Sequence, residues 1–178
     1  MKKKFGIIGS PIKHSLSPVL HKYWFKKYDI DADYSIIEAS EIELPEILEK
    51  IKQGNYTGVN VTLPFKQKII NYIDKVVNDA ELTGSVNTIL LDNEKTVVGE
   101  NTDVYGLQAA YLKEIDNNSN KKVLVVGAGG VSPSVILAIQ KSGIRNISIT
   151  NRTNEKCIFL KKKFSFLNII PWADLKSE

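Results

Sequence analysis

The sequence predicts an α/β fold in two lobes, of which the second is incomplete. Strand-like and helix-like segments alternate along the whole chain, an order typical of sheets with parallel strands. Residues 116–120 include no apolar side chain and divide this pattern into two parts. Residues 121–178 leave room for about three strands, half of the six in a complete doubly wound sheet.

The first lobe is expected to combine short strands, helices and one hairpin. Ser17 and Pro18 favour a helix start, and Gly54 favours the end of the next helix. In chain order the expected segments are strand 5–8, helix 17–28, strand 34–37, helix 43–52, strand 58–62, a helix from about 65 through 73, a helical stretch around 75–82, and hairpin strands 86–91 and 96–98.

The second lobe is expected to repeat a strand–helix unit after one connecting helix. Its segments are that helix at about 103–115, strand 122–126, a helix to about 142, strand 147–150, helix 154–163 and a weak strand at 169–170. We therefore predict a first domain over residues 1–102 and a second over residues 103–178.

Composition argues against several classes of function. The 43% hydrophobic and 25% charged residues are ordinary for a globular protein, and the longest apolar runs are far shorter than a membrane span. The net charge is +4, but the lysines are scattered, so no nucleic-acid partner is expected. Two histidines and the lone Cys157 supply neither a zinc site nor an internal disulfide, which favours a cytoplasmic protein without a metal.

A glycine turn follows the strand at 122–126 and leads into a helix near Ser132 and Pro133. Glycines let a backbone bend tightly and approach a pyrophosphate, while a helix start offers N–H donors and a partial positive charge. The strand before and the helix after it make this turn a predicted dinucleotide-binding loop. It consists of Gly127, Ala128, Gly129, Gly130 and Val131.

The end of the next strand bears on the choice of dinucleotide. An NAD site usually places Asp or Glu about 20 residues beyond the glycines. This chain has Asn151, Arg152 and Thr153 there. A guanidinium can bind a 2′-phosphate through two hydrogen bonds, whereas a carboxylate would repel it. The sequence therefore favours NADP as cofactor; the alternative is an exposed loop arginine without a special role.

Short polar side chains gather in four segments before this turn, at 9–18, 58–66, 84–88 and 99–106. Each lies at a strand end or a helix start, where open α/β sheets bind ligands. Lys66 and Asp103 add a cation and an anion that can order a hydroxyl and handle its proton. Capping and turn formation explain each residue singly, so the pattern alone predicts only a polar site beside a nucleotide fold. The polar set is Ser15, Ser17, Asn60, Thr62, Asn87 and Thr102.

These segments resemble the shikimate dehydrogenase family. The resemblance runs in order through the serine-rich first loop, Asn-Val-Thr-x-Pro-x-Lys at 60–66, Val-Asn-Thr at 86–88, Asn-Thr-Asp at 101–103, Gly-Ala-Gly-Gly at 127–130 and Asn-Arg-Thr at 151–153. It implies an α/β substrate-binding lobe followed by a Rossmann-like NADP-binding domain. It also implies the NADPH-dependent, reversible reduction of 3-dehydroshikimate to shikimate, a step of aromatic amino-acid biosynthesis.

The resemblance further implies a role for each polar residue. Ser15 and Ser17 would hold the substrate carboxylate. Lys66 would be the acid/base group, with Asp103 as its partner in positioning the reacting hydroxyl. The ring hydroxyls would be bound by Asn60, Thr62, Asn87 and Thr102. The expected partner is therefore the small-molecule substrate, and a homodimer stays open.

The chain departs from the family pattern in three places. Ser85 stands where the family usually has alanine, and Lys22 where it usually has asparagine. The later strands of the cofactor lobe and the C-terminal helices are missing, so residues 1–178 alone are expected to have little dehydrogenase activity. Two alternatives stay open: a quinate/shikimate dehydrogenase that uses NAD, which Arg152 opposes, and a non-catalytic shikimate-binding fragment.

Overall fold

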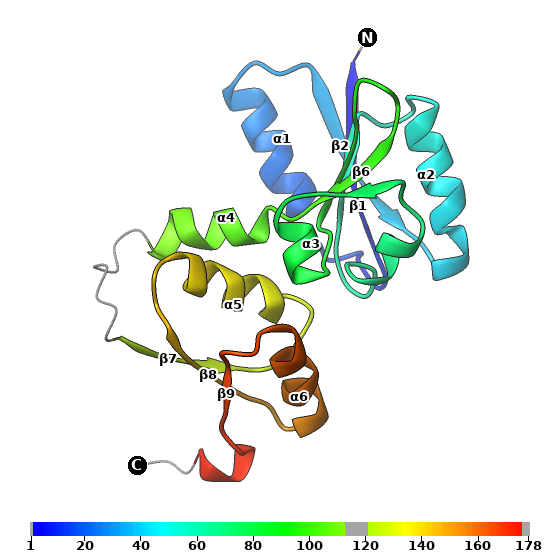
Figure 1. Cartoon of the computed structure of the whole chain (residues 1–178). Helices are drawn as coiled ribbons and strands as arrows, with labels where there is room; N and C mark the ends of the chain where they lie inside the picture. Colours follow the sequence, from blue (N-terminus) through cyan, green and yellow to red (C-terminus); the bar gives the residue numbers. More distant parts are fainter. Residues whose placement is uncertain (1, 113–120, 176–178) are drawn as a thin grey trace. The chain divides into compact units, whose positions relative to one another are not determined.

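The protein is described by a computed structural model that covers residues 2–112 and 121–175. The chain divides into two compact units, Met1–Asn101 and Thr102–Glu178. Each unit has its own sheet, with six strands in the first and three in the second, and helices pack against both sheets (Figure 1). The predicted α/β class is confirmed.

The sheet of the first unit is mixed rather than parallel throughout. Its strand order is β2-β1-β3-β5-β6-β4, in which β1 is parallel to β2 and β3, while β5 is antiparallel to β3 and β6. The β5–β6 pair is the predicted hairpin. The strands are β1 (Lys3–Gly9), β2 (Ala32–Glu38), β3 (Gly58–Val61), β4 (Lys75–Val76), β5 (Thr88–Leu91) and β6 (Val97–Glu100).

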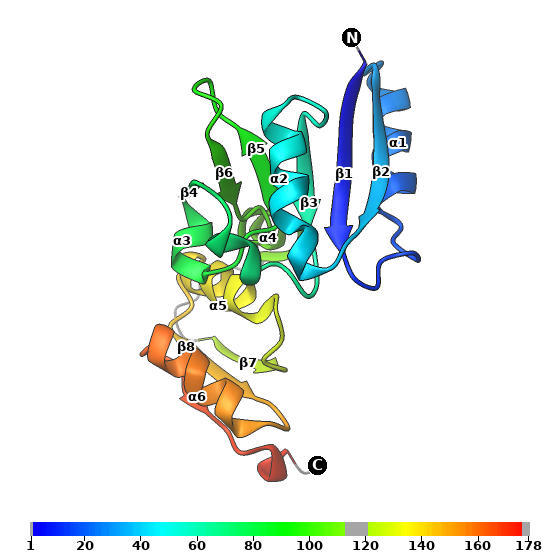
Figure 2. The same cartoon turned by 90° about the vertical axis from the view of Figure 1, so that its right-hand side faces the viewer.

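Helices α1 (Ser17–Lys27) and α2 (Leu44–Lys52) lie on opposite faces of this sheet (Figure 2). The apolar side chains of α2 recur at helical spacing and are buried against the main core of the unit: Leu44, Ile47, Leu48 and Ile51. Helix α1 fully buries none of its residues. Leu20 and Trp24, which lie four positions apart on this helix, remain 54% and 48% exposed.

Two predicted helices of the first unit are only partly right. The segment from Phe65 forms a tight turn and then a short 3₁₀ helix, Lys68–Asn71. The stretch at 75–82 divides into β4 and the short helix α3 (Asp79–Thr83). Strand β4 forms because Val76 pairs with Gly99 of β6, while the Asp74 carboxylate accepts the Val97 N–H at 2.9 Å. Pairing with the sheet overrides the local helical pattern.

The second unit contains three parallel strands in the order β7-β8-β9. This is the arrangement of one half of a Rossmann sheet. Its elements are α4 (Asp103–Leu107), a π-helical turn (Gln108–Leu112), β7 (Lys122–Val126), α5 (Ser132–Lys141), β8 (Asn146–Thr150), α6 (Asn154–Lys163), β9 (Asn168–Ile169) and a 3₁₀ helix (Trp172–Asp174). The predicted helix end at 113–115 and the linker at 116–120 lie outside the described residues.

The core of the second unit lies on one face of its sheet. Val125 and Ile149 pack there with Ile136 of α5 and Leu160 of α6. Cys157 is also buried, and burial raises the pKa of its thiol. On β7, alternate side chains point away from this core: Leu124 and Val126 are 41% and 61% exposed.

Candidate functional site

The polar segments of the first unit meet at one edge of its sheet. Strands β1, β3 and β6 run in the same direction, because β3 and β6 are both antiparallel to β5 between them. Their carboxyl ends and the amino end of β5 therefore lie together. Four stretches of the chain lie at this edge. The loop to Ser17 follows β1, Thr62 and Lys66 follow β3, and Asn101 follows β6. Asn87 directly precedes β5.

Ser15 and Ser17 are held by local and long-range hydrogen bonds. The Ser15 hydroxyl accepts the backbone N–H of Ser17 at 3.2 Å, which closes the turn before α1. The Ser17 side chain hydrogen-bonds the phenol of Tyr34 on β2. Both serines are half-buried, so the first loop offers two fixed hydroxyls at the sheet edge.

Asn60 lies at the centre of a set of hydrogen-bonded side chains that we call the polar relay: Tyr34, Asn60, Thr88 and Asn87. The Tyr34 phenol donates to Asn60 Oδ1 at 2.7 Å. Asn60 Nδ2 donates to the Asn87 carbonyl and to Thr88 Oγ1, both at 3.3 Å. The Thr88 hydroxyl donates to Asn87 Oδ1 at 3.0 Å. The relay thus joins three strands and two of the predicted substrate residues.

The backbone around Lys66 is fixed beside the Asn87 segment. The Lys66 carbonyl accepts the N–H of Val86 at 2.7 Å. Thr62 donates its N–H to the Ile8 carbonyl and accepts the N–H of Phe65, both at 2.9 Å. The Lys66 side chain is half-buried. Backbone bonds therefore hold Lys66 next to the relay.

Asn101 is a buried polar residue to which the sequence pattern assigned no role. It is 4% exposed, and its Nδ2 donates to the Ser85 carbonyl at 2.7 Å and to Thr83 Oγ1 at 3.2 Å. These bonds tie the end of β6 to the turn before Asn87. The Ser85 hydroxyl itself is buried without a hydrogen-bond partner among the described residues, at the position where the family resemblance implies alanine.

Thr102 and Asp103 begin the second unit, and Asp103 is the first residue of α4. Lys66 belongs to the first unit. That Lys66 and Asp103 act together on one hydroxyl therefore stays a prediction from the sequence.

In the second unit, the glycine turn is held by backbone geometry. Gly127 has φ +107°, a left-handed conformation that side chains other than glycine's rarely adopt. Its N–H donates to the Thr150 carbonyl at 2.8 Å, and its carbonyl accepts the Ser132 hydroxyl at 2.9 Å. A Cβ added to Gly129 would meet nothing within 4 Å, so this side of the turn is open to a close approach.

The turn and the Asn151 segment are directly connected. Asn151 Oδ1 accepts the N–H of Ala128 at 3.2 Å, and its Nδ2 donates to the Thr153 carbonyl at 2.9 Å. Arg152 lies between these two anchored residues and is exposed. Gly130 and the half-exposed Val131 complete the turn before α5. The structure thus brings the predicted nucleotide-binding residues together in one unit.

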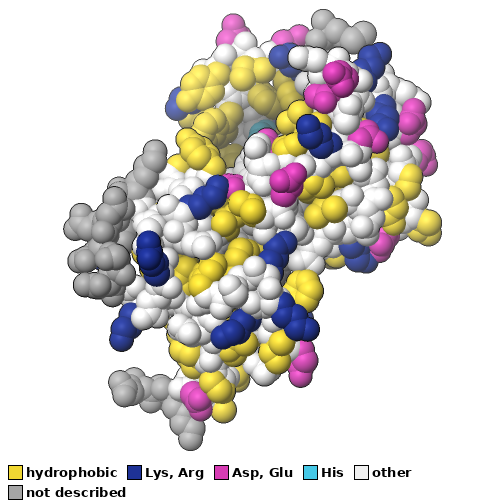
Figure 3. All heavy atoms as spheres, in the orientation of Figure 1, with side chains coloured by type: hydrophobic (Ala, Val, Ile, Leu, Met, Phe, Trp, Pro, Cys, Tyr) yellow, Lys and Arg dark blue, Asp and Glu magenta, His cyan; other side chains and the backbone are white. Residues whose placement is uncertain are grey.

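Two hollows lie beside α1. One, of about 390 Å³, has mainly apolar walls, including Phe5 and Phe25, and reaches Asn60 and Thr88 of the relay. Figure 3 shows hydrophobic side chains gathered over α1 next to it. His21 and Thr57 add further polar side chains to its lining.

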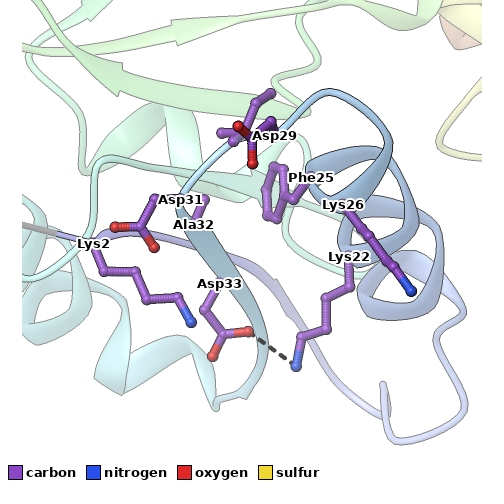
Figure 4. A pocket seen from close by; sticks show the side chains of 9 residues that line it. Lys2, Lys22, Phe25, Lys26, Asp29, Asp31, Ala32 and Asp33 are labelled. Carbon is purple, nitrogen blue, oxygen red and sulfur yellow. Dashed lines mark ion pairs between the residues drawn. The ribbon is translucent and has the colours of Figure 1, made fainter.

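The other hollow, of about 630 Å³, is lined by three lysines and three aspartates (Figure 4). Lys22 Nζ lies 3.0 Å from Asp33 Oδ1, and its hydrogen bond lowers the pKa of the Asp33 carboxyl. Because the charges balance, this hollow is not a candidate for binding an anionic ligand.

The part of the chain that the structure describes contains no cluster of three potential metal ligands among its His, Cys, Asp and Glu residues. No helix in residues 2–112 or 121–175 has the length and apolar character needed to cross a membrane.

Two family models match the chain. Residues 7–89 match the shikimate dehydrogenase substrate binding domain, and residues 110–178 match the shikimate/quinate 5-dehydrogenase model. The chain belongs to the shikimate dehydrogenase family. This membership confirms the resemblance that the sequence segments indicated.

Relatives within the shikimate dehydrogenase family align along almost the whole chain. The shikimate dehydrogenase (NADP⁺) of Pelagibacter ubique is 46% identical over 98% of this chain, and that of Shouchella clausii is 40% identical over 99%. The chain spans 65% of the length of each. Both are named shikimate dehydrogenases, so the quinate alternative is not favoured.

Solved structures of the family have the same fold. The Aquifex aeolicus shikimate dehydrogenase gives a TM-score of 0.86 at 38% identity, covering 95% of this chain and 62% of its own. The Thermus thermophilus enzyme, solved with NADP(H) and shikimate, gives 0.84 at 31% identity, covering 95% of this chain and 63% of its own.

Proposed function

We propose that this chain supplies the substrate-binding lobe and part of the cofactor lobe of an NADP-dependent shikimate dehydrogenase. The proposed reaction is the reversible reduction of 3-dehydroshikimate to shikimate. The observation that carries it is the single sheet edge at which the loop to Ser17, the Thr62–Lys66 segment, Asn87 and Asn101 gather. Hydroxyls and amides at one edge suit a small acid with several ring hydroxyls.

We assign the substrate contacts according to the family resemblance. Ser15 and Ser17 bind the carboxylate, which fits two half-buried hydroxyls that the turn and Tyr34 hold in place. The ring hydroxyls are assigned to Asn60, Thr62, Asn87 and Thr102. Three of these four belong to the first unit and lie on or beside β3 and β5.

The residues of the second unit fit a dinucleotide that carries a 2′-phosphate. The left-handed Gly127 and the open side of Gly129 allow a phosphate to approach the backbone. The exposed guanidinium of Arg152, next to the Asn151 anchor, can bind the 2′-phosphate with paired hydrogen bonds. We therefore propose NADP as the cofactor, with Gly127 to Val131 and Asn151 to Thr153 as its contacts.

In the proposed mechanism, the bound cofactor supplies or accepts the hydride. Lys66 delivers a proton to the carbonyl oxygen of 3-dehydroshikimate, and its positive charge stabilises the negative charge that develops on that oxygen. Asp103 orients the reacting hydroxyl. In the reverse direction Lys66 accepts the proton as the hydroxyl is oxidised.

Replacing the proposed acid/base group tests this function. In the whole protein, Lys66→Ala is expected to lower shikimate oxidation about 10²- to 10⁴-fold, because proton transfer is lost. Shikimate affinity, measured by calorimetry, is expected to change much less. Lys68→Ala is the matched control, since Lys68 is an exposed neighbour paired with Glu41. Wild-type turnover by Lys66→Ala would refute the role of Lys66, and a whole protein that does not oxidise shikimate with NADP⁺ would refute the function.

We further propose that the protein works in the cytoplasm, as a homodimer. The lone buried Cys157 fits a reducing compartment. The exposed apolar face of α1, which includes Leu20 and Trp24, offers a surface for a second copy. Light scattering of the whole protein tests the dimer.

A further inference from the structure

The hydrogen bonds of the polar relay have directions that the chemistry of its atoms determines. The Asn87 carbonyl can only accept, so the NH₂ group of Asn60 must face it. Oδ1 of Asn60 consequently faces Tyr34, and the phenol must be the donor. Burial raises the pKa of Tyr34, so the phenol keeps the proton that this bond requires.

Thr88 fixes the other side of Asn60. Its hydroxyl oxygen accepts from Asn60 Nδ2, and its single proton goes to Asn87 Oδ1. Both amide hydrogens of Asn60 are thus engaged by Asn87 and Thr88, while Tyr34 occupies one lone pair of Oδ1. The remaining hydrogen-bonding capacity of the Asn60 side chain is an acceptor lone pair.

We propose that Tyr34 and Thr88 are positioning residues that present Asn60 to the substrate as a hydrogen-bond acceptor. The group that Asn60 binds must then be a hydroxyl that donates, and a ketone or an ether oxygen at that place is rejected. Neither Tyr34 nor Thr88 needs to touch the substrate for this effect. The inference rests on the proposed function, because it takes Asn60 as a substrate contact.

The surroundings of Tyr34 support a fixed geometry rather than a mobile side chain. Tyr34 is 2% exposed and its ring stacks on His21, with centroids 4.1 Å apart and planes 7° apart. Ile7 and Ile12 pack in the same small core. Tyr34→Phe therefore removes the phenol hydroxyl with little change in packing, and Thr88→Val does the same for the threonine hydroxyl.

A double-mutant cycle tests the proposal. Shikimate affinity is measured by calorimetry for wild type, Tyr34→Phe, Thr88→Val and Asn60→Ala, and for each of the first two changes combined with Asn60→Ala. Tyr34→Phe and Thr88→Val are each expected to weaken binding about 10- to 100-fold. In the Asn60→Ala background their effects are expected to be much smaller, because the part that passes through Asn60 is gone and only the Tyr34 contact with Ser17 and the Thr88 bond to Asn87 remain.

The half-buried Tyr56 packs against the main core of the same unit, so Tyr56→Phe is the matched control and is expected to bind like wild type. Equal losses from Tyr34→Phe with and without Asn60 would overturn the proposal, since they would show that Tyr34 does not act through Asn60. Unchanged affinity in both Tyr34→Phe and Thr88→Val would overturn it as well.

A second readout separates this inference from the proposed function. The side-chain NH₂ of Asn60 is expected to give two NMR signals protected from solvent exchange, and Thr88→Val is expected to remove the protection of one. Tyr34→Phe is expected to broaden both signals or shift them. If wild type does not bind shikimate, the proposed function fails, while these signals still decide the positioning roles: unchanged signals in both variants would refute them.

Discussion

In the first unit, polar side chains from β2, β3 and β5 hold one another in place, whereas in the second unit the backbone forms the glycine turn. Asn60 depends on partners 26 and 28 positions away in the sequence, Tyr34 and Thr88. Gly127 depends on its own φ and on backbone bonding to Thr150. A site built by side chains is therefore sensitive to the loss of distant partners, and a site built by the backbone is sensitive to conformation at one position.

The largest effect is expected at Gly127. A Cβ there would meet no atom within 4 Å, so Gly127→Ala tests conformation alone. Because alanine is strained at the left-handed φ of this position, Gly127→Ala is expected to lower the free energy of unfolding by about 1–3 kcal/mol. It is also expected to weaken binding of 2′,5′-ADP at least about 10-fold. Gly143 also has a left-handed φ and open space. Gly143→Ala is therefore expected to destabilise the fold similarly without changing nucleotide affinity; equal loss of affinity in both variants would contradict the comparison.

Arg152 extends the backbone-built site with one side chain. Arg152→Ala is expected to weaken 2′,5′-ADP binding about 10- to 100-fold and to leave 5′-ADP binding nearly unchanged, because only the 2′-phosphate contact is lost. Calorimetry with both ligands measures the difference. Arg145→Ala is the control, since Arg145 is the other exposed arginine of this unit. A similar change for both ligands would show that Arg152 does not select the 2′-phosphate.

Replacing Ser85 tests how much a buried hydroxyl without a hydrogen-bond partner lowers the stability of the first unit. Its buried hydroxyl has no partner among the described residues, so Ser85→Ala is expected to raise the free energy of unfolding by about 1 kcal/mol. Urea denaturation measures the change. Thr83→Val is the opposite case, because the Thr83 hydroxyl donates to the Asp79 carbonyl at 2.6 Å, and it is expected to destabilise. A destabilised Ser85→Ala would mean that the hydroxyl has a partner after all.

The smallest effect is expected from His21, which stacks on Tyr34 of the relay. Burial lowers the pKa of His21 below its ordinary value of 6.5, so the unfolded chain binds more protons than the folded one near that pH. The contribution of His21 to stability is present above pH 6.5 and is lost as the pH falls below it. His21→Gln should flatten the decline in urea midpoint between about pH 7 and 5, and an unchanged decline would contradict this expectation.

Much of the fold follows from local patterns in the sequence. Helix α6 begins and ends where the sequence predicted, at Asn154 and Lys163, and β7 matches residues 122–126. The sequence predictions fail where pairing with a distant strand determines the secondary structure. Val76 belongs to a strand only because β6 lies beside it, and the local pattern at 75–82 gives no sign of that pairing.

The candidate site divides in the same way. The glycine turn can be predicted from the sequence, because a left-handed φ favours glycine and Gly127 is a glycine. Thr88 stands in the same Val-Asn-Thr segment as Asn87, so the sequence also offers it as a site residue, although only Asn87 is predicted to bind the substrate. The contact between Tyr34 and Asn60 cannot be predicted from the local sequence, because the phenol reaches Asn60 only when β2 and β3 pair with β1 in the same sheet.

The uncovered side of β7 has a consequence for handling the protein in solution. Among the described residues β7 is an edge strand, and Leu124 and Val126 lie exposed on it. An apolar edge of this kind can template pairing between molecules, and the nearby Lys121 and Lys122 oppose this by mutual repulsion. Salt screens that repulsion, so the 178-residue chain should resist association at high protein concentration best when the ionic strength is low.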